Sequence, residues 1–252
     1  MIRALALLVA LWAAAPAGAA CRQALALGLD VSGSVDAREY RLQLDGLAAA
    51  LTDPEVRATL LAMPAAPVAL AVYEWSGPDH QALILDWTPI DGPVALRRVA
   101  DRLRGWQRAA APETTALGQA LLFGGALLAR APGCWARTLD ISGDGRNNTG
   151  PRPRATRGAA VLAGVTVNAL VIGADTGNPQ DRRQAEIGAL VSYFRAEVLR
   201  GPGAFLETAL GFEAYPRAMK RKLLRELEAL AVGRAATPFK SAAGEPISGV
   251  SR

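Results

Sequence analysis

The sequence predicts an α/β fold: a doubly wound, mostly parallel sheet with one antiparallel edge strand and helices on both faces. Three observations support this. The chain has 252 residues, 51% of them hydrophobic, which suits one globular domain with a full core. Short apolar runs alternate with stretches of helical periodicity, as in strand–helix crossovers. Two of these runs end in polar loops, where folds of this class bind ligands.

The first elements are well marked. Leu25–Val31 is an apolar run that predicts a buried strand. A helix follows, with Asp36 at its N-cap and Glu39 three residues later, as in a capping box. Val68–Trp75 and Ala82–Trp87 flank a Ser-Gly-Pro-Asp turn and therefore predict an antiparallel hairpin.

The alternation continues to the end of the domain. Helices are predicted over Pro93–Trp106, Thr115–Ala129, Thr156–Ala163, Arg183–Leu199 and Tyr215–Leu230, and strands over Thr138–Ser142, Val165–Ile172 and Ala204–Thr208. Residues 233–252 are rich in Ala, Gly, Ser and Pro and lack periodicity, so we expect a disordered tail there. The globular domain is expected over residues 21–232.

Residues 1–20 have the pattern of a secretory signal peptide. Arg3 is followed by an apolar run up to Ala15 and then by small residues before Cys21. The run is shorter than the ~20 apolar residues of a membrane-spanning helix, so no stable transmembrane segment is expected. We expect export to the periplasm or the medium. Lipid attachment at Cys21 is less favoured, because the leucine usual three places upstream is absent.

Charge and cysteine content narrow the function classes. The net charge is +5, and the basic residues are scattered over helix-like stretches, so nucleic-acid binding is not expected. Cys21 and Cys134 are the two cysteines, and in an exported chain a pair of cysteines indicates a disulfide.

Asp30, Ser32 and Ser34 form a D-x-S-x-S sequence at the end of the first predicted strand. A loop with this alternation can direct a carboxylate and two hydroxyls at one point. Such hard oxygen ligands suit Mg²⁺, which keeps several waters and an exchangeable position. Asp and Ser also populate ordinary turns, so this loop by itself leaves the turn reading open.

Thr115 at a predicted helix start and Asp144 before Gly145, after a third strand, complete a wider pattern. This order and spacing resembles the metal-ion-dependent adhesion site of the von Willebrand factor A family, over about residues 24–230. The resemblance implies that Ser32 and Ser34 bind the metal directly. It implies that Thr115 and Asp144 bind directly or through water, and that Asp30 acts through water.

The resemblance extends to smaller motifs. The run Ser-Gly-Asp-Gly-Arg-Asn-Asn over residues 142–148, Gly-Pro-Gly-Ala-Phe over 201–205 and Lys-Arg-Lys-Leu over 220–223 are similar to an uncharacterised bacterial branch of exported von Willebrand A proteins. It implies Mg²⁺, with Mn²⁺ or Ca²⁺ as alternatives, and a protein partner presenting Asp or Glu. It assigns no reaction, and we expect no enzyme.

Two details depend on the family pattern. Many members have Gly-Gly before the threonine, whereas Pro112, Glu113 and Thr114 precede Thr115 here. Thr114 is therefore an alternative ligand, and Glu113 could crowd or supplement the site. The family sheet also places the strands that follow Cys21 and Cys134 side by side, which implies a disulfide between these cysteines.

Two other functions compete with metal-dependent protein binding. A metal-dependent hydrolase or phosphatase would need a nucleophile and converging carboxylates. No G-x-S-x-G elbow occurs, and we expect the lone His80 at the far side of the sheet from the serine loop. Asp36 is explained by N-capping. A structural domain with a non-functional site is the other alternative, and metal titration distinguishes it.

Overall fold

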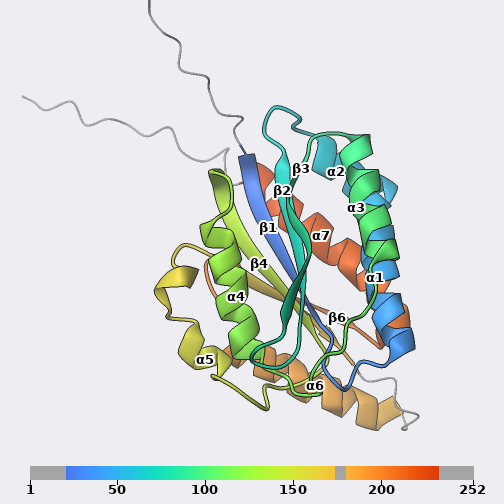
Figure 1. Ribbon diagram of the computed structural model, residues 1–252, viewed down its shortest axis with the longest axis vertical. Helices are drawn as coiled ribbons and strands as arrows, with labels where there is room; N and C mark the ends of the chain where they lie inside the picture. The colour runs from blue at the N-terminus through green and yellow to red at the C-terminus, as the bar shows by residue number, and fades with distance from the viewer. Residues whose placement is uncertain (1–20, 174–179, 233–252) are drawn as a thin grey trace, which may run out of the picture.

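Strand β1 (Cys21–Asp30) lies in the middle of the sheet, and all of its residues are buried. The computed structural model describes residues 21–173 and 180–232. The sheet has the order β3-β2-β1-β4-β5-β6 (Figure 1). Its other strands are β2 (Val68–Trp75), β3 (Gln81–Ile90), β4 (Cys134–Gly143), β5 (Thr166–Ile172) and β6 (Leu206–Ala209). Only the edge strand β3 pairs with its neighbour in antiparallel fashion, as the sequence predicts.

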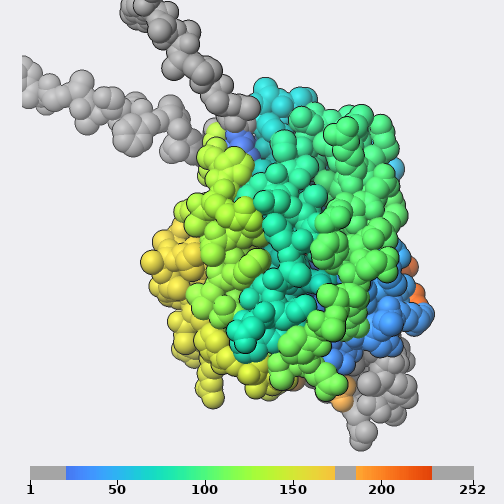
Figure 2. Space-filling model, viewed as in Figure 1, coloured from blue at the N-terminus to red at the C-terminus, as the bar shows by residue number. Residues whose placement is uncertain are grey.

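Helices cover both faces of the sheet, so the expected doubly wound α/β fold is confirmed. One face packs against α1 (Ala37–Thr52), α2 (Pro54–Leu61), α3 (Pro93–Gly105) and α7 (Tyr215–Val232). The other packs against α4 (Leu117–Ala129), α6 (Gln180–Glu197) and the short helix η1 (Ala160–Leu162). The short helices α5 (Pro153–Thr156) and η2 (Phe212–Ala214) complete the set. In the space-filling view, β3 and α3 lie side by side at the surface (Figure 2).

Several local signals act as the sequence predicts. Asp36 caps α1 by accepting from the backbone amides of Arg38 and Glu39, and the Glu39 side chain accepts from the Asp36 amide. Asp53 caps α2, and Pro54 occupies its first turn. Helix α2 is absent from the predicted elements although both of these start signals precede it.

The predicted helix over Thr156–Ala163 is wrong. The segment forms only the end of α5 and the separate three-residue η1. Between them Gly158 and Ala159 interrupt the helix, because Ala159 has an extended conformation with ψ 142°. Glycine is a poor helix former, and the alanine-rich composition hid this break.

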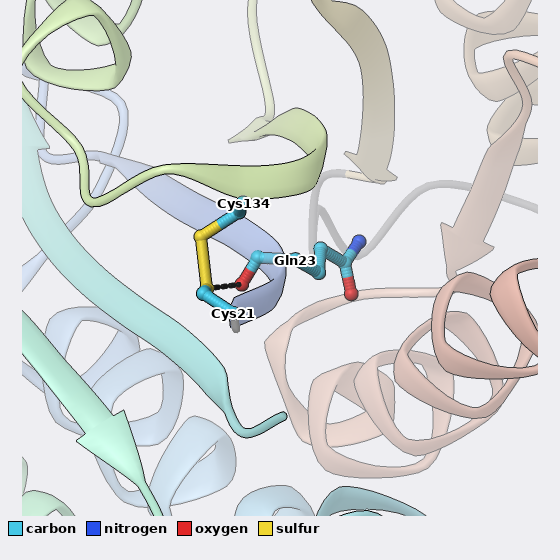
Figure 3. The surroundings of a disulfide bond; sticks show 3 residues. All are labelled: Cys21, Gln23 and Cys134. Atoms are coloured by element: carbon cyan, nitrogen blue, oxygen red, sulfur yellow. Dashed lines mark hydrogen bonds between the residues drawn. A yellow bond between two sulfur atoms is a disulfide. The ribbon is translucent and has the colours of Figure 1, made fainter. Parts of the chain in front are cut away.

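The register between β1 and β4 places Cys21 directly opposite Cys134, and the two form a disulfide (Figure 3). The pairing implied by the family sheet is confirmed. The bridge joins the amino ends of the two strands whose carboxyl ends carry the polar loops. The predicted signal peptide and the predicted C-terminal tail lie outside the described residues. No helix in residues 21–173 and 180–232 combines the length and apolarity that crossing a membrane requires.

Candidate functional site

The serine loop begins where β1 ends, at the carboxyl edge of the sheet. Asp30 accepts a hydrogen bond at Oδ1 from the Ser32 amide, at 2.9 Å, which closes a local turn. The Gln43 side chain of α1 donates to the Asp30 carbonyl at 3.0 Å. The second carboxylate oxygen of Asp30 is buried and has no hydrogen-bond partner among the described residues. A buried oxygen of this kind is costly unless a cation or a donor reaches it.

Thr115 is brought against the serine loop. It is buried, and its Oγ1 lies 3.2 Å from Ser32 Oγ, which in turn lies 3.4 Å from Ser34 Oγ. Thr114 is exposed and turns toward the β2–β3 turn, since its Oγ1 is 3.0 Å from where a Cβ on Gly77 would lie. The geometry therefore favours Thr115 over Thr114 as a member of the site.

Asp144 reaches the same point from the loop after β4. Its Oδ1 accepts a hydrogen bond from Ser34 Oγ at 2.7 Å. Gly143 leaves room for Asp30, because a Cβ at Gly143 would stand 3.3 Å from Asp30 Oδ2. The five side chains predicted from the sequence thus converge from three loops at one edge of the sheet.

The environment of the site disfavours two ionised carboxylates. Burial, followed by the nearby charge of Asp144, raises the pKa of Asp30 to about 8, although the Ser32 hydrogen bonds oppose this shift. Burial also raises the pKa of Asp144, against its hydrogen bond from Ser34. Each shift means that the ionised carboxylate is disfavoured where it lies. A cation bound between the two groups would reverse that penalty.

The donor set therefore fits a hard divalent cation. Two carboxylates and three hydroxyls are oxygen ligands, and they leave coordination positions for water or an external ligand. The described part of the chain contains no cluster of three or more His, Cys, Asp and Glu side chains with metal-binding spacing. Three of the five candidate ligands, Ser32, Ser34 and Thr115, are neutral hydroxyls, so they would not offset the charge of a bound cation.

Three further residues hold the loops, and the sequence alone did not identify them. Arg108 donates to the carbonyls of Val35 at 2.8 Å and Val31 at 2.9 Å, so it clamps the serine loop from behind. The Asn148 side chain accepts from the Thr115 amide at 2.8 Å.

The third residue is Asn147, whose side chain accepts from the Gly118 amide at 3.1 Å. The two asparagines belong to the run over residues 142–148 that carries the family resemblance. The sequence therefore marked their positions, but it did not indicate that they bind the backbone at Thr115 and Gly118. Arg108 lies in a loop with no motif of its own.

Glu113 packs beside the serine loop. The Glu113 carbonyl accepts from the Gly33 amide at 3.0 Å, and a Cβ on Gly33 would lie 2.7 Å from the Glu113 Cβ. A larger residue at position 33 would collide with this loop. Gly33 thus allows the threonine loop and the serine loop to approach each other.

The expected position of His80 is wrong. Strand β2 is parallel to β1, and the Val31 amide donates to the Trp75 carbonyl at 2.9 Å, so the turn after β2 lies at the same edge as the serine loop. His80 Nε2 is 3.9 Å from Glu74 Oε1. The expectation failed because a strand parallel to the central strand delivers its following turn to the same edge of the sheet.

Solved proteins with a similar fold include von Willebrand factor A domains. Proximal thread matrix protein 1 from the mussel byssus, in a structure with a zinc-occupied MIDAS motif, is 15% identical with a TM-score of 0.54, over 83% of this chain and 46% of that one. The pilus adhesin SpaC from Lactobacillus rhamnosus GG, in its open conformation, is 13% identical with a TM-score of 0.53, over 84% of this chain and 30% of that one.

A von Willebrand factor type A protein from Catenulispora acidiphila is 12% identical with a TM-score of 0.52, over 83% of this chain and 43% of that one. The chain thus spans less than half the length of these proteins, and the likeness establishes the fold. A family model described as "Protein of unknown function (DUF1194)" matches residues 20–231. No curated protein matches the chain in sequence.

Proposed function

The chain belongs to the family described as protein of unknown function (DUF1194), has a von Willebrand factor A fold, and, we propose, is an exported protein-binding domain that captures its partner through a divalent cation. The observation that carries this proposal is the convergence of five oxygen-bearing side chains at one edge of the sheet, among them Asp30 with a buried, unpartnered carboxylate oxygen. The disulfide and the N-terminal pattern support export.

The proposed ligands are Asp30, Ser32, Ser34, Thr115 and Asp144. Mg²⁺ suits them best, because the set is all oxygen and rich in neutral hydroxyls. A bound divalent cation would supply a positive centre that accepts a carboxylate from another molecule. The residues of this chain hold that centre in place, since Arg108 and Asn148 fix the backbone of two of the three loops. An Asp or Glu side chain of a partner protein is the proposed ligand.

Titration with MgCl₂, followed by the midpoint of urea unfolding, tests the site. Binding to the native state alone stabilises it by about 2.7 kcal/mol at a concentration one hundred times the Kd. We expect this response in the wild type, and its loss in Asp144→Asn and in Thr115→Val, which both keep the shape of the side chain. Thr114→Val is the matched control and should respond like the wild type. Identical responses in all four proteins would eliminate the metal site and favour a structural domain.

Partner capture tests the binding step. Immobilised protein should retain a ligand from the native cell envelope in Mg²⁺ and release it in chelator. Asp144→Asn, immobilised in parallel, should retain nothing that depends on Mg²⁺. Equal recovery with and without chelator from both proteins would contradict capture through the cation.

A further inference from the structure

A second polar pocket lies beside the proposed metal site. It has a volume of about 390 Å³, and its lining includes Arg146, Asn147, Asn148, Arg152, Tyr193 and Glu197. Arg146 follows Asp144 by two residues, in the loop after β4. Asn148, also in this wall, accepts a hydrogen bond from the Thr115 amide at 2.8 Å. One wall of the pocket is therefore continuous with the loops that carry two of the proposed ligands.

Hydrogen bonds hold this wall in place. The Asn147 amide donates to the Tyr193 hydroxyl at 3.2 Å, and the Asn147 side chain donates to the Thr149 carbonyl at 2.9 Å. The side-chain oxygen of Asn147 accepts a hydrogen bond from the Gly118 amide of α4. The loop is thereby tied to α4 and to α6. A prearranged pocket binds a ligand without the cost of ordering its own loop.

The positive charges that line the pocket are not fully balanced by acidic side chains of the protein. Arg146 and Arg152 are exposed, and neither forms an ion pair within the described residues. Arg146 lies over the Tyr193 ring, with its guanidinium carbon 5.5 Å from the ring centre. Glu197 is the one acidic residue in the lining, so the pocket has a positive excess.

Several other arginines already bond to the backbone. Arg108 donates to loop carbonyls, and Arg157 donates to the Leu199 carbonyl at 3.0 Å. Arg200 donates to three carbonyls, including that of Arg157 at 2.6 Å. These side chains are structural. Arg146 donates only one long hydrogen bond, at 3.5 Å to the Ala189 carbonyl, and the Arg152 side chain forms none within the described residues. Their guanidinium groups therefore remain largely available to a carboxylate, which arginine can bind with two hydrogen bonds.

We propose that this pocket binds a second acidic side chain of the same partner, so that the ligand is an acidic peptide segment with two carboxylates, one for the cation and one for Arg146 and Arg152. The inference rests on the proposed function. In this proposal the pocket determines specificity. A partner with one carboxylate can bind the cation alone. A partner with a second carboxylate at the right spacing also contacts the two arginines and binds more tightly.

Synthetic Gly/Ser peptides test this. One carries a single aspartate, and the others carry a second aspartate at increasing spacing. Binding is measured in Mg²⁺ and in chelator. At one spacing, the wild type should prefer the two-aspartate peptide by about five-fold or more, since an ion pair at the upper end of the surface range gives about that factor. The preference should disappear in the double variant Arg146→Gln/Arg152→Gln.

Two further variants test whether the loss of preference comes from a general loss of positive charge or from misfolding. Arg98→Gln removes an exposed arginine of α3 that forms no ion pair within the described residues, and it should keep the preference. Glu197→Gln removes the acidic lining residue and should increase the preference, a gain that misfolding could not produce.

The outcomes separate the two levels of the proposal. Mg²⁺-dependent binding with equal affinity for one and two aspartates would overturn the pocket and leave the metal site intact. No Mg²⁺-dependent binding of any peptide would overturn both. A preference that survives in the double arginine variant would also overturn the assignment to this pocket.

Discussion

Strand β4 and its following loop contribute to two groups of acidic residues that differ in their partners. In the core, Asp140 and Glu226 each lie 2.6 Å from the ammonium of Lys222, and all three side chains are at most 1% exposed. At the edge of the sheet, Asp30 and Asp144 contact hydroxyls and backbone amides, and among the described residues no basic side chain is hydrogen-bonded to either. The core group thus has a basic side chain as its partner, whereas the edge group has neutral donors.

This difference explains what each group can do. Burial opposes the charge of Lys222, but Asp140 and Glu226 outweigh it and raise the pKa of Lys222, so the ammonium stays charged. The core group is therefore closed and structural, and it joins α7 to the sheet. In the function proposed above, the edge group binds a cation from solvent, so its charge balance would change on binding. The permanent cation of the core group adds stability, whereas an exchangeable one at the edge would allow binding.

Lys222→Met should have the largest effect. It leaves two carboxylates buried without their shared cation, and breaking a buried ion pair in this way costs about 3 to 5 kcal/mol. Urea unfolding monitored by circular dichroism measures this loss. Lys220→Met is the control, because Lys220 pairs with Asp53 and Glu55 at the partly exposed surface, and it should lose no more than about 1 kcal/mol. Equal losses in the two variants would contradict a special role for the core group.

Removing the disulfide should cost about 2 to 5 kcal/mol. The bond closes a loop with a sequence separation of 113 residues, and cross-links over long loops restrict the unfolded chain strongly. The variant Cys21→Ser/Cys134→Ser, compared with the wild type in urea, gives the value. Because the bridge lies at the opposite end of β1 from the edge group, the Mg²⁺ response should remain. Its disappearance would mean that the two ends of the sheet are coupled.

The metal-free protein should lose stability as the pH rises from about 4 to about 8. The folded protein holds a proton on Asp30 up to a pKa of about 8, well above the ordinary value of an aspartate, so deprotonation favours the unfolded chain in this window. We expect a loss of a few kcal/mol, since each pKa unit between the folded and the unfolded chain corresponds to about 1.4 kcal/mol.

Unfolding in chelator at a series of pH values measures this loss. Asp30→Asn should flatten the profile, and Mg²⁺ should flatten it in the wild type. A part of the slope should remain in both cases, because burial raises the pKa of Asp140 to about 7 despite the opposing charge of Lys222, and Mg²⁺ does not reach that residue. A profile that is unchanged by Asp30→Asn would contradict the raised pKa of Asp30.

Arg108→Gln should have the smallest effect, a weaker affinity for Mg²⁺ at the carboxyl edge of the sheet. Its loss frees the carbonyls of Val31 and Val35, and residues that support metal ligands typically change metal affinity by about ten- to hundred-fold. We expect about ten-fold weaker Mg²⁺ binding by calorimetry. Arg104→Gln, an exposed residue of α3, should leave the affinity unchanged. Similar changes in both variants would contradict the clamp.

Much of the fold was predictable because its signals are local. The β2 strand has the predicted bounds, and the capping box of α1 lies where Asp36 and Glu39 place it. The failures have local causes too. The predicted Thr156–Ala163 helix runs across Gly158, where the structure breaks it, and α2 was missed although Asp53 and Pro54 are helix start signals.

By itself, the sequence determined the strand–helix order and the identity of the five candidate ligands, since each lies in a short motif at the end of a predicted strand or at the start of a predicted helix. Only the tertiary structure decided which groups meet. It turned Thr115 rather than Thr114 toward Ser32, brought Arg108 behind the serine loop and placed His80 at the same edge. These contacts join residues far apart in the chain, so they depend on strand order and register, which no local pattern encodes.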